Sequence, residues 1–130
     1  MKIHSLKWLP VPRVWVNEGG LEYVEDYLDF VEGVSKLTKV PFSFQRLRFS
    51  AFRLQVRGMS RDFFIIRGPG EVDLISDILA MFEGLKGQRR FYWKGDGKPG
   101  WLFYLTPGIA KIHMHREQCQ LISAVYWWHW

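Results

Sequence analysis

The sequence predicts an α+β fold: a bulged antiparallel sheet, barrel-like or sandwiched, with one amphipathic helix packed on it. Short segments of alternating polarity, one long segment of helical periodicity and an aromatic content of 17% support this class. A chain of 130 residues fits one domain and can bury about two-thirds of its unfolded surface. We therefore expect residues 1–130 to form a single domain.

The clearest predicted element is a helix from Glu71 to Lys86. Acidic residues stand near its start and Gly87 follows its end, as the helix dipole and left-handed C-caps favour. Its large apolar residues recur at helical spacing and need a sheet to pack on: Leu74, Ile75, Ile78, Leu79, Phe82 and Leu85.

Alternating residues in the middle of the chain predict a hairpin. Apolar and polar residues alternate over residues 46–57, and a phase slip at Ala51-Phe52 is interpreted as a β-bulge. Residues 58–61 then turn the chain into a second strand from Asp62 to Arg67. Residues 36–44, around Pro41, are predicted to be a connecting loop.

The remaining segments are assigned with weaker patterns. Residues 1–16 contain two prolines and predict an extended arm or edge strand. Residues 21–34 fit either a short helix or irregular strands, because helical spacing and a crowd of aromatic residues occur together. The last four strands are predicted at residues 88–94, 101–105, 109–116 and 120–130.

Charge is unevenly distributed along this chain of net charge +5. Residues 18–32 contain six acids and no base, whereas residues 36–61 contain seven bases and no acid. This layout predicts that neighbouring copies meet acidic side to basic side, and solvated faces of opposite sign are an equally weighted alternative. The predicted interface comprises Glu22, Glu25, Asp29, Arg46, Arg48, Arg53 and Arg57.

The C-terminal end is rich in tryptophan, which is unusual because chain ends are normally polar. If residues 126–130 alternate as a strand, Trp128 and Trp130 share one face and Trp127 lies on the other. One face can join the core, which leaves the other for a partner. These three tryptophans are therefore added to the predicted subunit interface.

The alternative function is nucleic-acid binding. Arg46, Arg48, Arg53 and Arg57 project from one predicted strand pair, with phenylalanines interleaved. Basic residues beside stacking aromatics suit single-stranded nucleic acid. However, alternation places those phenylalanines opposite the arginines, in the core, so this reading rests on charge alone.

No motif for catalysis, metal or cofactor binding stands out, so we expect a non-enzyme with no cofactor and no small-molecule substrate. His113 and His115 would share a face of a strand, and Cys119 and His129 follow, but no third ligand stands at a fixed spacing. Cys119 lacks an evident base and orienting group. The glycine-rich loop at residues 95–100 opens no helix, unlike a phosphate-binding loop.

The single cysteine excludes an internal disulfide. The N-terminal residues lack a signal-peptide pattern, and no apolar stretch reaches membrane-spanning length. We therefore expect synthesis in the cytoplasm and no membrane partner.

The chain resembles a family of small phage tail-tip proteins, the minor tail protein M of lambda-like phages. The resemblance covers residues 46–126: an alternating strand at residues 49–56, the amphipathic helix, and the run Phe82 to Trp93, in which a glycine turn leads to an aromatic strand. A later strand with Trp101 and an apolar C-terminal strand also fit. The resemblance implies a virion structural protein that forms a ring joining the tail tube to the tip and contacts neighbouring tail proteins. It implies no catalytic residue.

If the tryptophan-rich end serves assembly, removing residues 127–130 leaves a folded monomer that no longer enters particles. Circular dichroism and incorporation into purified particles measure the two properties separately. Loss of folding on truncation would instead show that the end belongs to the core.

Overall fold

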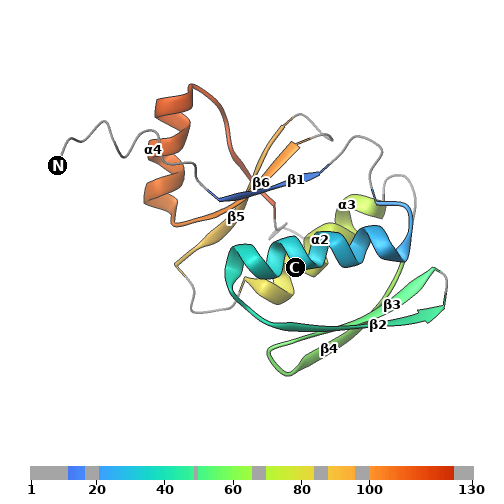
Figure 1. The fold of residues 1–130 in the computed structure, drawn as a ribbon. Helices are drawn as coiled ribbons and strands as arrows, with labels where there is room; N and C mark the ends of the chain where they lie inside the picture. The colour runs from blue at the N-terminus through green and yellow to red at the C-terminus, as the bar shows by residue number, and fades with distance from the viewer. Residues whose placement is uncertain are drawn as a thin grey trace.

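The structure is a computed structural model that describes residues 12–16, 21–48, 50–65, 70–83, 88–95 and 100–124. Two antiparallel sheets lie on either side of a pair of helices, α2 (Val24–Thr38) and α3 (Gly70–Phe82) (Figure 1). A third helix, α4 (Pro107–Glu117), covers the outer face of one sheet. The predicted α+β class is confirmed.

The larger sheet has the strand order β1-β6-β5-β7. Its strands are β1 (Arg13–Val16), β5 (Arg90–Lys94), β6 (Gly100–Leu105) and the short β7 (Ile122–Ser123), all in antiparallel pairs. Strand β6 is buried on both faces, because Leu102 packs toward α2 and α3 while Phe103 packs toward α4. The strands predicted at residues 88–94 and 101–105 and the edge strand within residues 1–16 are confirmed.

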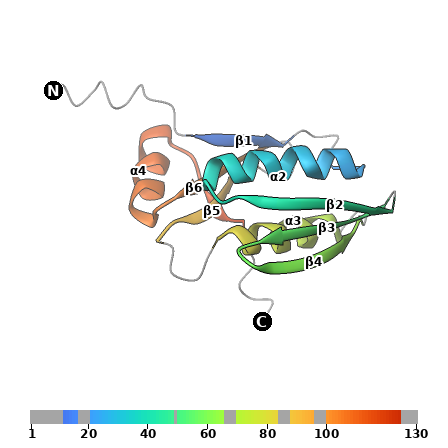
Figure 2. The same cartoon turned by 60° about the horizontal axis from the view of Figure 1, so that its bottom comes forward.

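The smaller sheet has the strand order β2-β3-β4, with β2 (Phe42–Arg48), β3 (Ala51–Val56) and β4 (Met59–Phe64). In β3, Phe52, Leu54 and Val56 are buried against the helices, while Arg53 and Gln55 point to the opposite face. Figure 2 shows α2 between β1 and β2, with α3 behind the smaller sheet. No described helix covers this sheet's outer face.

Helix α2 settles the ambiguity of residues 21–34. Its buried residues recur at helical spacing: Val24, Tyr27, Phe30, Val31 and Val34. The carboxylate of Asp26 accepts the backbone N–H groups of Glu22 and Tyr23 at 3.0 and 2.9 Å, which caps the start. Lys39, with φ 62°, ends the helix in a left-handed cap. Aromatic residues did not disfavour the helix here, because they lie on the side that meets a sheet.

Helix α3 confirms most of the predicted helix. Leu74, Ile78, Leu79 and Phe82 are buried in the main core, as their spacing predicted. Residues 84–87, with the predicted glycine cap, lie outside the described residues. The core cluster joins side chains from both helices and both sheets, so α3 packs on two sheets and not on one.

The strand predicted at residues 109–116 is wrong, because these residues form α4. Pro107 stands in the first turn, and the Thr106 hydroxyl accepts the Ile109 N–H at 3.2 Å. Ala110 and His113, three apart, are the buried residues of the helix. The apolar residues of this segment do not form a clear helical stripe, and its β-branched residues favour a strand. The capping residues at its start were the local signal that favours a helix.

Three local predictions between residues 36 and 61 also need correction. The loop at residues 36–44 is shorter, because α2 continues to Thr38 and β2 begins at Phe42. The phase slip at Ala51-Phe52 follows a turn between β2 and β3, and the register shift lies between Arg46 and Arg48. The second turn falls at Arg57-Gly58, where both residues have positive φ, so β4 starts earlier than predicted.

Two predicted regions fall largely outside the described residues. Nothing is described of residues 1–11, most of the predicted arm, or of residues 125–130, which contain Trp127, Trp128 and Trp130. Of the predicted last strand, only β7 is described.

Gly100 and Gly108 give a matched pair of substitutions to alanine. A Cβ at Gly100 would collide with the Trp93 ring and lie 2.9 Å from the Lys94 carbonyl oxygen, whereas nothing lies within 4 Å at Gly108. We expect Gly100→Ala to lower the free energy of unfolding by about 1–3 kcal/mol. Gly108→Ala, inside α4, should raise it by up to about 1 kcal/mol. Urea unfolding measures both, and equal effects would contradict this packing.

Candidate interaction surfaces

Both edge strands of the smaller sheet are tied to the helices by arginine side chains. Arg46 of β2 donates to the carboxylate of Glu25 on α2 at 2.5 Å, and Arg61 of β4 donates to Asp77 on α3 at 3.1 Å. Each arginine lies on the helix-facing side of its strand, since it is paired in register with the buried Phe52 or Leu54. The sequence placed Glu25 and Arg46 in a contact between copies, whereas the structure joins them within one chain.

Arg53 is also engaged within the chain, on the outer face of the smaller sheet. Its guanidinium donates to both carboxylate oxygens of Asp62 on the neighbouring strand, at 2.7 and 3.2 Å. This hydrogen bonding lowers the pKa of Asp62 and raises the pKa of Arg53. The fork joins β3 to β4 and removes one cation from the predicted interface.

Of the predicted interface, Glu22, Asp29, Arg48 and Arg57 keep no ion pair among the described residues, and neither do Glu32, Lys36 and Lys39 of the same two segments. The acids Asp29 and Glu32 are exposed along one stripe of α2, and Glu22 is exposed just before the helix begins. The bases Arg48 and Arg57 are exposed on the smaller sheet and its turn. The structure therefore brings acids and bases of the sequence prediction to two separate surfaces of one chain.

The outer face of the smaller sheet also exposes an aromatic side chain. Phe64 on edge strand β4 has 63% of its surface exposed. Met59 of the same strand is 49% exposed, but its register partner is the buried Val56, so it lies on the helix-facing side. The register places Arg48, Ala51 and Phe64 in one row across the three strands, so a cation and an exposed ring flank a small residue. This combination of apolar and charged groups is typical of protein interfaces.

Sequence patterns missed a second surface, on the outer face of the larger sheet. The register pairs Arg13 with Phe103 and Trp15 with Trp101, and it pairs Lys94 with Trp101 on the other side. These residues come from three strands that are far apart in the sequence. The alternation of residue types within Arg13–Val16 was the sequence signal for this surface. The segment is too short to predict which strand it pairs with.

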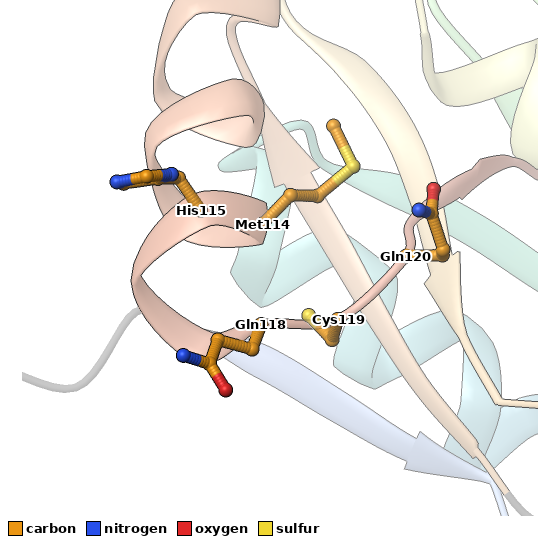
Figure 3. Close-up of a pocket in the computed structure, with 5 residues that line it drawn as sticks. All are labelled: Met114, His115, Gln118, Cys119 and Gln120. Carbon is orange, nitrogen blue, oxygen red and sulfur yellow. The ribbon is translucent and has the colours of Figure 1, made fainter.

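Helix α4 separates the residues that were considered for metal binding. His113 is buried, with its ring centroid 4.9 Å from that of Phe103, whereas His115 is exposed and points away from Cys119 (Figure 3). Burial lowers the pKa of His113; Glu117 acts against this, and Arg13, Lys94 and Arg116 add to it. An open hollow of about 430 Å³ is lined by Met114, His115, Gln118, Cys119 and Gln120, so His115 and Cys119 border the same space while His113 does not. The described residues contain no group of three or more His, Cys, Asp or Glu placed to hold a metal ion.

One carboxylate is buried at the junction of α3 and β5. Glu83 has 3% of its surface exposed; its Oε2 accepts the Phe91 N–H at 3.1 Å, and its Oε1 lies 3.8 Å from Arg90 Nε. Burial raises the pKa of Glu83, although the Phe91 hydrogen bond and Arg90 oppose this. The group joins two elements of the core and lines no described hollow, so we assign it a structural role.

No family model, no curated protein and no solved structure matches this chain. None of the helices in the described part of the chain has the length and apolar character that crossing a bilayer requires.

Glu83→Gln should make stability less dependent on pH. The raised pKa means that the folded chain binds the proton more readily than the unfolded chain, so wild-type stability falls as pH rises above the ordinary value of 4.5. Glutamine keeps an oxygen for the Phe91 N–H without the buried charge. We expect the variant to match or exceed the wild type at neutral pH, measured by urea unfolding from about pH 4 to about pH 8.

Asp62→Asn is the matched control, since the pKa of Asp62 is lowered and its contribution is lost as pH falls. A Glu83→Gln variant much less stable than wild type at neutral pH would show that attraction to Arg90 outweighs burial.

Proposed function

We propose that this protein is a non-enzymatic structural subunit that assembles with copies of itself through protein–protein contacts. The observation that carries the proposal is the position of unpaired acids and unpaired bases on different surfaces of one chain. Two surfaces that complement each other but not themselves form head-to-tail contacts, which close into rings when the rotation allows.

The acidic surface is the stripe on α2. Glu25 is neutralised by its own Arg46, while Glu22, Asp29 and Glu32 have no ion pair among the described residues. Because Asp29 and Glu32 lie on a regular helix, their spacing is fixed before any partner binds. Such preorganised charge favours orientation and rate of association more than affinity.

The complementary surface is the outer face of the smaller sheet. Arg48 and Arg57 supply the unpaired bases, and Phe64 supplies apolar area that a partner can bury. Strands β2 and β4 are both at the edges of the described sheet. Arg61 points toward the helices from β4, and inward charges of this kind disfavour uncontrolled strand addition. Side-chain contact across the sheet face is therefore the mode that we favour.

We propose the tip of a phage tail as the place of this assembly, where the protein is a connector subunit of the virion that contacts neighbouring tail proteins. The support is the sequence resemblance over residues 46–126. We expect mass spectrometry of purified particles to detect peptides of this chain in the tail fraction. Their absence from particles would contradict the location while leaving self-assembly to be judged by the next experiment.

The alternative, a small basic nucleic-acid-binding or anti-defence protein acting through Arg46, Arg48, Arg53 and Arg57, has less support. Arg46 and Arg53 each donate to a carboxylate of the same chain, which leaves two unpaired cations on that surface. We therefore prefer protein contact for the smaller sheet.

Charge reversal tests the contact between copies. We expect the wild type to form a defined oligomer in native mass spectrometry, and Asp29→Lys with Glu32→Lys, or Arg48→Glu with Arg57→Glu, to be monomeric. An equimolar mixture of the two variants should form oligomers in which the two variants alternate, because each retains one wild-type surface and the altered surfaces again have opposite charges. Raising salt should weaken all of these species.

Lys111→Glu reverses an exposed charge on α4 and is the matched control, which should assemble like the wild type. A wild type that remains monomeric at every concentration, or a control that disrupts assembly equally, would contradict the proposed contact.

A further inference from the structure

The outer face of the larger sheet gathers aromatic and basic side chains beyond the edge of α4. Cross-strand partners share a face of a sheet, so Trp15, Trp101 and Lys94 form one row across β1, β6 and β5. The next row holds Arg13, Phe103 and Tyr92. We call the residues Arg13, Trp15, Tyr92, Lys94 and Trp101 the aromatic face.

Two indole rings form the centre of this surface. Trp15 and Trp101 have ring centroids 4.7 Å apart and are tilted by 58°, and Trp15 has 46% of its surface exposed. Helix α4 packs over the Phe103 end of β6 through Ala110 and His113, and Trp101 is only partly buried against this cluster. Flat aromatic surface therefore remains accessible on the outside of the sheet.

The same surface is positively charged. The Arg13 guanidinium lies 5.4 Å from the centre of the Trp101 ring and 4.9 Å from that of Phe103, and Lys94 stands beside Trp101 in the register. Arg13 and Lys94, together with Arg116 of α4, are close enough to lower the pKa of the buried His113. Acids lie beside this surface: Asp29 of α2 lines a hollow together with Trp15, and Glu117 of α4 opposes the effect of these cations on the pKa of His113.

Exposed indoles beside cations narrow the choice of ligand. A neutral carbohydrate can stack on indoles but has no charge to pair with the cations. An acidic protein segment can pair with the cations but has few flat rings to stack on the indoles. A nucleic-acid strand with unpaired bases supplies both a stacking surface and phosphates. We propose that the aromatic face binds single-stranded nucleic acid, with bases stacked on Trp15 and Trp101 and phosphates beside Arg13 and Lys94.

This inference uses other residues than the assembly contact, which lies on α2 and the smaller sheet, although Trp15 lines a hollow together with Asp29 of the α2 stripe. It also differs from the nucleic-acid site that the sequence suggested. Arg46 and Arg53 of that site donate to carboxylates, and the phenylalanines of the same strands, Phe44 and Phe52, are stacked on each other in the core. The aromatic face instead keeps its rings and cations on the same side of one sheet.

The test is fluorescence anisotropy of a labelled oligothymidine of about ten nucleotides with the full chain, at several salt concentrations. We expect salt-sensitive binding. Trp15→Ala should weaken it by about fivefold to a hundredfold without a change of charge, the range found for loss of one stacking partner. Lys94→Ala should weaken binding and reduce the slope of log affinity against log salt by about 0.7, as for one lost phosphate contact.

The smaller sheet provides matched controls. Phe64→Ala removes a more exposed ring, and Arg57→Ala removes an exposed cation, and neither should change the affinity by more than about twofold. Circular dichroism of each variant shows whether it is folded, and Lys94→Ala tests the surface independently of any packing role of Trp15.

Three outcomes would overturn the proposal. The first is no binding of the oligonucleotide at low salt. The second is an equal loss of affinity in the controls and in the variants of the aromatic face, which would indicate unspecific attraction to a basic protein. The third is a change in oligomeric mass of Trp15→Ala without oligonucleotide, which would make this face a contact between copies.

Discussion

The fold depends on the burial of two helices between two sheets. Tyr27 of α2 lies against Phe52 of β3 with ring centroids 5.4 Å apart, and Phe52 is stacked between Phe44 and Phe63 of the flanking strands. On the other side, Phe91 and Leu102 of the larger sheet belong to the same core cluster. A helix that meets sheets on two sides must be apolar over most of its surface, which explains why α3 contains almost no charge in its described middle. Either sheet alone would leave this core exposed.

This layered arrangement also decides which surfaces are available to partners. Each sheet uses one face for the shared core, so among the described residues the sheets offer a partner only their outer faces, next to the exposed stripe of α2. The larger sheet is partly covered by α4, and the smaller sheet has no described cover. The two outer faces differ in chemistry: the smaller sheet presents an ion-paired polar surface with Phe64 at its edge, and the larger sheet presents indoles with cations. One chain can therefore carry two separate interaction surfaces.

Intramolecular pairing changes how charge in the sequence should be understood. The acidic and basic segments are adjacent in the chain, and α2 and β2 are adjacent in space, so Glu25 and Arg46 meet each other before any partner is present. Arg53 donates to Asp62 on the neighbouring strand of a hairpin. Dividing the sequence into acidic and basic segments could not indicate this pair. Exposed pairs of this kind contribute little to stability, yet they remove charges from the sets that a partner can use. The acids and bases that have no ion pair within the described chain give a more specific hypothesis for the contact between copies.

The sequence by itself determined the α+β class, the α3 helix and most strands, because these rest on local periodicity and turn chemistry that neighbours do not alter. It left α2 undecided, because burial by tertiary contacts outweighs the preferences of aromatic residues. It assigned α4 to a strand, because β-branched residues outweighed the capping signal of Thr106 and Pro107 in that prediction. Only the tertiary structure decided which charges are paired and which rings share a face. The row of Trp15, Trp101 and Lys94 joins three strands through the order β1-β6-β5, and strand order is a property of packing that no local pattern contains.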